Sequence, residues 1–169
     1  VIFHSRSRTK TVYFVYSGEV MLYNLTKHGN RKVIFILGKG RLLNQSIVSK
    51  KPNALFCESA CPVQVIEIAE TQFLQLMEQS HALTRAVLRE YERNLWRMGH
   101  QLKNTTGNMQ MERKIAAKLW KLGRDFGVDT EDGVMIDIDL TITLMADLVG
   151  APRENVSRAC KVLTDRGLI

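Results

Sequence analysis

The segment 140–163 constrains the fold of this chain more than any other, because it joins two helical patterns through a turn that few residues permit. Gly150 lies where the first helix must end, and glycine readily takes the positive φ that favours such an end. Pro152 follows, and proline is common in the first turn of a helix, where its missing N–H costs little. Thr141 or Thr143 can cap the first helix. The segment therefore predicts a helix-turn-helix.

The second helix of this segment separates polar from apolar side chains. Successive residues of an α-helix are about 100° apart around its axis. This spacing places a polar, mostly basic group on one arc: Arg153, Glu154, Ser157, Arg158 and Lys161. The opposite arc is apolar and can pack on the first helix; it holds Val156, Ala159, Cys160 and Leu163. Such a helix is commonly just an amphipathic surface helix, but the preceding caps and turn favour one that reads the major groove of DNA.

The polar side chains suit two kinds of DNA contact. Arginine donates two hydrogen bonds to one guanine, and glutamate accepts a hydrogen bond from cytosine. We therefore expect base contacts from Arg153, Glu154, Ser157 and Arg158. Hydroxyls at a helix N-terminus and lysine ammonium groups meet phosphates, so we expect phosphate contacts from Thr141, Thr143 and Lys161.

Composition agrees with a polyanionic partner. The net charge is +7 and the pI is about 9.5, although the basic residues are spread widely enough to form an ordinary solvated surface. No apolar run approaches the ~20 residues needed to span a bilayer, so we expect no membrane partner. Three cysteines are too few for a disulfide framework and lack metal-ligand spacing. We expect reduced thiols and a cytoplasmic location, with no metal site and with Cys160 in the core.

The first 70 residues have the pattern of short strands. Runs of β-branched and aromatic residues are separated by turn residues at 27–30 and 38–40. The expected strands are 11–16, 19–25, 32–37, 54–58 and 63–68. Short strands at regular spacing predict a sandwich or barrel.

From residue 70 the period becomes helical. Residues 70–77 predict a short helix, and Ser80 can cap a long helix over 81–103. Its apolar residues are spaced 3, 4, 3 and 4 apart and form a coiled-coil seam of Leu88, Tyr91, Leu95, Met98 and Leu102. The seam can pack on the chain's own β domain or on a partner helix. A helix of about 23 residues spans roughly 35 Å, which exceeds one small domain and favours a homodimer.

The remaining segments connect these parts. We expect a hinge at 104–108, a helix over 113–126 with Ile115, Leu119 and Leu122 on one face, a polar loop at 127–133 and a strand at 134–138. Residues 166–169 read as the turn into a wing whose second strand is missing, and the start at Val1 suggests truncation there too.

The order of these elements resembles the CRP/FNR superfamily of bacterial transcription regulators over nearly the whole chain. Residues 13–20 look like the β-roll segment of that family, and residues 153–158 with 167–169 look like its recognition helix and wing start. The resemblance implies an α+β fold. A double-stranded β-helix (jelly-roll) sensor domain of cyclic-nucleotide-binding type would span 1–77, a dimerisation helix 78–104 and a winged helix-turn-helix domain 105–169. It implies a palindromic DNA site with TTGA- or TGTGA-like halves, and RNA polymerase as a partner.

The resemblance also bears on the effector. In cAMP-binding members a Gly-Glu pair and an Arg-Ser pair hold the ribose and the cyclic phosphate. Their positions meet Asn44-Gln45 and about Asn53-Ala54, which lack the carboxylate and the guanidinium. We therefore expect a small-molecule or redox signal other than cAMP. An effector in the same cavity would meet Leu43, Asn44, Gln45, Asn53, Ala54, Gly99 and His100.

Other cofactors of the family are not expected. An Fe–S cluster needs four cysteines, and the fourth would fall near Ile66. Only His4 and His28 could serve as a heme ligand of the β domain, and loop histidines are more often solvated. The cofactor therefore stays unknown. The alternative function is a small-molecule-binding module or enzyme with an incidental helix pair. Because no nucleophile–base set, paired carboxylates or phosphate loop is present, we do not expect an enzyme.

Overall fold

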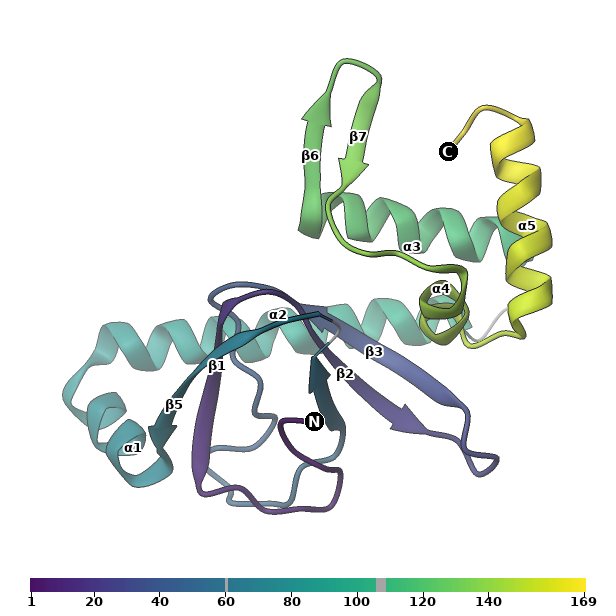
Figure 1. The fold of residues 1–169 in the computed structure, drawn as a ribbon. Coiled ribbons are helices and arrows are strands. Elements are labelled where there is room, and N and C mark those ends of the chain that lie inside the picture. Colours follow the sequence, from purple (N-terminus) through teal and green to yellow (C-terminus); the bar gives the residue numbers. More distant parts are fainter. Residues whose placement is uncertain (60, 106–108) are drawn as a thin grey trace. The chain divides into compact units, whose positions relative to one another are not determined.

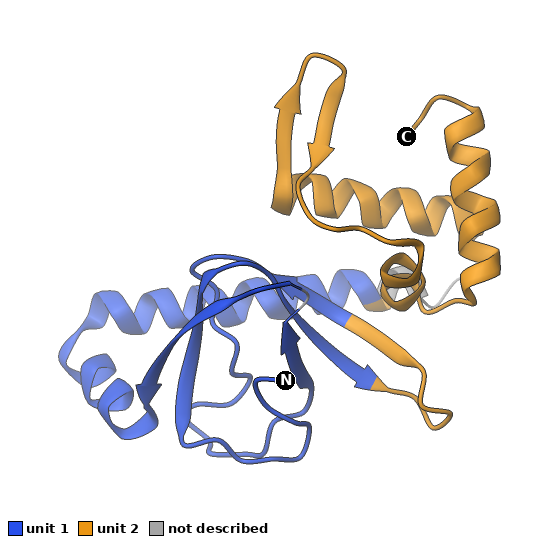
Figure 2. Cartoon of the chain, in the orientation of Figure 1, with its two compact units in different colours: residues 1–24, 34–101 blue, residues 25–33, 102–169 orange. Residues whose placement is uncertain are grey.

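The computed structural model describes residues 1–59, 61–105 and 109–169 (Figure 1). The chain separates into two compact units (Figure 2): an N-terminal unit of residues 1–24 and 34–101, and a C-terminal unit of residues 25–33 and 102–169. The expected hinge at 104–108 is not seen in its first two residues, and the rest of it is not tested. Residues 104–105 continue a helix, and residues 106–108 lie outside the described residues.

Five strands lie within the described residues up to 70, where runs of β-branched and aromatic residues predicted them. β1 (Thr11–Ser17) pairs with β5 (Gln64–Ala69) in one antiparallel sheet. β2 (Val20–Leu25) lies between β3 (Arg31–Leu37) and β4 (Phe56–Ser59) in another. All five lie within a few residues of their expected bounds.

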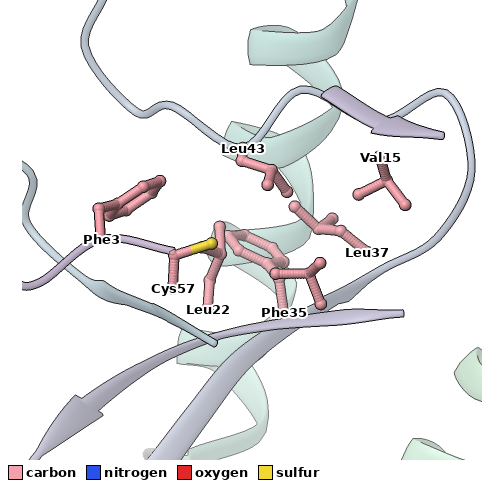
Figure 3. Close-up of a cluster of buried hydrophobic side chains, with 8 residues drawn as sticks. Phe3, Val15, Leu22, Phe35, Leu37, Leu43 and Cys57 are labelled. Atoms are coloured by element: carbon pink, nitrogen blue, oxygen red, sulfur yellow. The ribbon is translucent and has the colours of Figure 1, made fainter. Parts of the chain in front are cut away.

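Two clusters of buried side chains form the core of the N-terminal unit. The first lies between the strands and includes Phe3, Val15, Leu22, Phe35, Leu37, Leu43 and Cys57 (Figure 3). The second joins the strands to the helices through Val12, Leu42, Ile47, Phe73 and Val87. Each Val, Leu, Ile or Phe side chain among them contributes about 1.5–3 kcal/mol when it is fully buried.

Two helices follow the last strand of this unit. α1 (Glu70–Gln79) and α2 (His81–Thr105) are separated at Ser80, whose Oγ accepts a hydrogen bond from the Leu83 N–H at 3.2 Å. The expected cap is therefore confirmed. Thr84 Oγ1 donates to the Met77 carbonyl at 2.6 Å and fixes the bend between the helices.

The C-terminal unit contains α3 (Met111–Phe126), β6 (Gly127–Thr130), β7 (Gly133–Ile136), α4 (Ile142–Val149) and α5 (Arg153–Asp165). Ile115 and Leu122 of α3 are buried as expected, and Leu119 is half-buried. Residues 166–169 form a turn that ends α5, in which the N–H of Gly167 donates to the Thr164 carbonyl. Within the described chain no helix is long and apolar enough to cross a membrane.

The hairpin of β6 and β7 corrects the expected polar loop at 127–133. Residues 127–130 form a strand that pairs antiparallel with β7, and β7 spans 133–136 rather than 134–138. The chain reverses at Gly133, which has a φ of 137°. Most side chains of both strands are exposed, so no apolar pattern marks these strands in the sequence. The pairing is made by backbone groups.

Candidate nucleic-acid interface

The helix-turn-helix forms from caps and turns that the sequence encodes locally. Thr141 is the N-cap of α4, and its Oγ1 accepts from the Leu144 N–H at 3.1 Å. Thr143 lies inside the first turn and is not the cap. Gly150 ends α4 in the left-handed conformation, with φ 71° and ψ 48°, and its N–H donates to the Ala146 carbonyl at 2.8 Å. The predicted turn is confirmed.

The second helix, α5, begins directly after this turn. Pro152 is its N-cap residue and has extended backbone angles, φ −57° and ψ 140°. Its carbonyl accepts from the Asn155 and Val156 N–H groups at 3.1 and 3.2 Å. Glu154 lies in the first turn, where the positive end of the helix dipole stabilises a carboxylate.

The two arcs of α5 differ in burial as the sequence predicted. Val156, Ala159 and Leu163 are buried, and α5 packs against α3 and α4. Cys160, which was expected in the core, is only half-buried, and this burial raises the pKa of its thiol. The polar arc is exposed throughout: Arg153, Glu154, Ser157, Arg158 and Lys161. Thr141 and Thr143 are also exposed, at the N-terminal end of α4.

One interaction on α5 was not predicted. The Nη2 atom of Arg158 donates a hydrogen bond to Oδ1 of Asn155, with 2.5 Å between the atoms. A spacing of three residues brings side chains together on a helix, so the Asn155–Arg158 spacing was a usable signal.

The C-terminal unit holds a second feature that the sequence did not indicate. Lys32 Nζ donates to the Leu148 carbonyl at 3.0 Å, in the last turn of α4. A cation is favourable at the carbonyl end of a helix. Burial lowers the pKa of Lys32, and the nearby charge of Lys114 lowers it further.

The expected seam on α2 lies mainly on an exposed face. Leu88, Leu95, Met98 and Leu102 are 55%, 72%, 46% and 64% exposed. Tyr91 differs because it is half-buried and packs against the second core cluster, so it belongs at least partly to the chain's own β domain. Burial raises its pKa to about 12.

Two of the expected effector residues, Leu43 and Asn44, are buried among the strands of the β domain. Leu43 is part of the first core cluster. Asn44 is buried, and its Oδ1 accepts from the Tyr13 N–H at 2.8 Å while its Nδ2 donates to the Thr11 carbonyl at 2.9 Å. Both polar ends of Asn44 are therefore engaged by the strand beside it.

Gln45 closes the neighbouring loop from inside the chain. Its Oε1 accepts from the N–H groups of Ala54 and Leu55 at 3.1 and 3.3 Å, and its Nε2 donates to the Leu43 carbonyl at 3.3 Å. Ala54 itself is exposed. Asn53 is buried, and its Nδ2 has no hydrogen-bond partner within the described residues.

The helix contribution to this region differs from the expected one. Gly99 and His100 are exposed on α2, whereas Gln101 Nε2 donates to the Ile34 carbonyl at 2.7 Å. Arg97 is buried, with its guanidinium 5.6 Å from the centre of the Phe35 ring. Residues 97 and 101 therefore face the β domain because they lie about one helical turn apart.

A second polar contact joins α2 to the loop after β3. Arg41 Nε and Glu90 Oε1 form an ion pair of 2.9 Å, with both side chains only 15% exposed. Among the described residues there is no group of three or more His, Cys, Asp or Glu side chains that could hold a metal ion.

Comparison with known proteins matches two segments of the chain to family models. Residues 1–80 match the family model of the cyclic nucleotide-binding domain, and residues 113–169 match that of the Crp-like helix-turn-helix domain. The chain is 25% identical to the cAMP-activated global transcriptional regulator CRP of Haemophilus influenzae, over 99% of this chain and 75% of the relative. This chain belongs to the CRP/FNR family. The global nitrogen regulator of a Nostoc species is 23% identical, over 99% and 76%.

Solved structures share this fold. FixK2 from Bradyrhizobium japonicum has a TM-score of 0.83 at 20% identity, over 98% of this chain and 80% of that one. The c-di-GMP responsive regulator CLP of Xanthomonas campestris has a TM-score of 0.77 at 18% identity, over 99% and 83%. The expected fold class is confirmed.

Membership in the CRP/FNR family also decides the class of function. The chain is a DNA-binding transcription regulator, and the relatives with this fold are regulators rather than enzymes. The alternative of a small-molecule-binding module or enzyme with an incidental helix pair is therefore set aside.

Proposed function

We propose that this CRP/FNR regulator binds a palindromic DNA site as a homodimer, with α5 of each copy in a major groove. The observation that carries the proposal is the division of α5 into a buried apolar arc and an exposed polar arc directly after the Gly150 turn. A helix held in this way can present its polar residues to base edges without disturbing the core.

Residues take different roles within this proposal. Arg153, Glu154, Ser157 and Arg158 contact base edges, because they share the exposed arc near the N-terminal end of α5. Thr141, Thr143 and Lys161 contact phosphates. The Thr141 hydroxyl accepts from the Leu144 N–H, which leaves its own hydrogen free to donate to a phosphate oxygen.

The dimer is proposed through α2. Leu88, Leu95 and Leu102 recur every seven residues on its exposed face, with Met98 beside them. Leucines in a heptad repeat pack into the facing helix of a coiled coil. A second copy of the chain covers this apolar stripe most simply, because a two-fold axis pairs equivalent residues.

The signal is proposed to be something other than cAMP. Gln45 supplies an amide where a carboxylate would hold a ribose hydroxyl, and its Oε1 already accepts from Ala54 and Leu55. Asn53 is neutral and cannot balance the charge of a cyclic phosphate. Its Nδ2, which has no hydrogen-bond partner among the described residues, can donate to an acceptor atom of an uncharged ligand.

A small molecule is favoured over a redox signal. Reactive sensor cysteines have lowered pKa values, whereas all three thiols here have raised ones. Burial raises the pKa of Cys57 to about 12, a hydrogen bond to the Glu19 carboxylate raises that of Cys61, and burial raises that of Cys160.

The ligand would shift the population of two arrangements of the recognition helices. RNA polymerase is the partner through which the DNA-bound protein acts.

Fluorescence anisotropy with short duplexes tests the proposal. A duplex with two TTGA- or TGTGA-like halves, with centres about 34 Å apart, should bind about 10³-fold or more tightly than a random duplex. Moving the halves apart by half a helical turn should remove most of this preference, because the two α5 helices then face opposite sides of the DNA. Equal binding to all duplexes would refute sequence-specific recognition.

A further inference from the structure

Asn155 and Arg158 lie three residues apart on α5, and Arg158 Nη2 donates to Asn155 Oδ1. Both side chains are exposed, so the bond does not stabilise a core. Asn155 is also not the helix cap, since Pro152 holds that position and accepts from the Asn155 N–H. The consequence of the bond is the direction in which Arg158 points.

The bond draws the guanidinium toward the first turn of α5, the end of a recognition helix that reaches base edges. A guanidinium has five N–H donors. One bond to Asn155 leaves enough of them to pair with O6 and N7 of a guanine. An arginine that is already ordered loses less side-chain freedom on binding.

Arg158 is bonded to Asn155 rather than to Glu154. Glutamate four residues before arginine is a favourable ion-pair spacing on a helix. Yet within the described part of the chain Arg158 bonds Asn155 and forms no ion pair with Glu154. The Glu154 carboxylate therefore remains available to accept from a cytosine.

We infer that Asn155 is a positioning residue for base recognition, which acts through Arg158. The inference rests on the proposed function. A competing role is direct contact, because an asparagine amide can pair with adenine. The two roles differ in one respect: a positioning effect vanishes once Arg158 is removed.

The test is a double-mutant cycle on the full chain. Asn155→Ala, Arg158→Ala and the double variant are titrated against a half-site panel in which each base pair is changed singly. Asn155→Ala should lower the preference for the cognate pair about three- to tenfold, the size expected for ordering one long side chain. The loss should fall at the pair whose preference Arg158→Ala removes. In the Arg158→Ala background, Asn155→Ala should change no preference by more than about twofold.

Two further variants separate positioning from folding. Asn155→Asp retains an acceptor for the guanidinium, so it should keep the base preference while it weakens binding to all duplexes by charge repulsion. Thr164→Ala alters another exposed residue of α5 and should leave the preference unchanged. Alanine favours a helix more than asparagine does, so Asn155→Ala should melt no lower than wild type.

Each outcome has a distinct meaning. If the wild-type protein prefers one duplex and the Asn155→Ala variant keeps that full preference, the inference is overturned and the proposed function stands. An Asn155→Ala effect that persists without Arg158 would show direct contact and also overturn it. A wild-type protein that binds every duplex alike would overturn the proposed function, and the inference with it.

Discussion

Glu154 is an acidic residue on a helix face whose other charged groups are basic, and its position supports two roles. In the first turn of α5 a carboxylate stabilises the helix through the dipole, by about 0.3–1 kcal/mol. A carboxylate in a major groove instead selects cytosine. The two roles predict different results when the side chain is removed.

Glu154→Ala should relax the choice of base at one C·G pair of each half-site. We expect it to lower discrimination at that pair by about 1–3 kcal/mol and to leave the other positions unchanged. Titrations on a panel of half-site variants measure this. An equal loss of affinity for every duplex would mean that Glu154 supports the helix and does not read a base.

Lys161→Ala serves as the contrasting variant, because Lys161 is exposed and lies three residues beyond Arg158, the last of the residues proposed to contact bases. It should weaken binding to all sequences alike and reduce the salt slope of log K by about 1. Affinities measured over a series of salt concentrations test this. A sequence-dependent effect would move Lys161 from the phosphate contacts to the base contacts.

Cys57 should be the least reactive thiol of the native chain. Burial raises its pKa to about 12 and disfavours the thiolate, which is the form that reacts. The folded state therefore keeps Cys57 protonated at pH 8, and only above about pH 9 does this preference begin to cost stability. Timed alkylation with iodoacetamide should label Cys57 far more slowly than Cys61, whereas in urea the two should react alike. Rapid native labelling of Cys57 would contradict its burial.

At the scale of elements, α4 depends on a single side-chain cap. Thr141→Ala removes the acceptor of the Leu144 N–H and should cost about 0.5–2 kcal/mol. Thr143→Ala is the matched control, because Thr143 lies one residue inside the helix and is also exposed. Urea unfolding and amide exchange at Leu144 should distinguish them. Equal effects of the two variants would show that the cap contributes little.

The exposed stripe of α2 predicts association. Replacing Leu95 and Met98 with Glu puts four carboxylates into the proposed dimer interface, two from each copy, and sedimentation should then show monomers. The sites are 72% and 46% exposed in the single chain, so the monomer itself should stay folded. A double variant that remains dimeric would place the interface elsewhere.

At the scale of the whole molecule, cAMP should neither bind tightly nor stabilise the protein. Gln45 and Asn53 offer no charge to a ribose or a cyclic phosphate. Calorimetry should detect no micromolar binding, and a thermal-shift series with cAMP should be flat. A true ligand at 100 times its dissociation constant would add about 2.7 kcal/mol, so the same assay can screen other metabolites.

Much of this architecture follows from the sequence because it depends on near neighbours. A period of two or 3.6 residues places side chains on a face, and the Ser80 cap, the Gly150 turn and the two arcs of α5 each involve residues a few positions apart. These features were predicted and observed at almost the same residues.

The structure decided what depends on contacts that the side-chain pattern does not encode. Residues 127–130 form a strand because their backbone pairs with β7. Tyr91, expected in the seam, instead packs against the second core cluster. Asn44 has its partners 31 to 35 residues away, and two of the three partners of Gln45 lie nine to ten residues away. No local pattern specifies such partners, because a buried amide bonds whichever backbone group the fold brings to it.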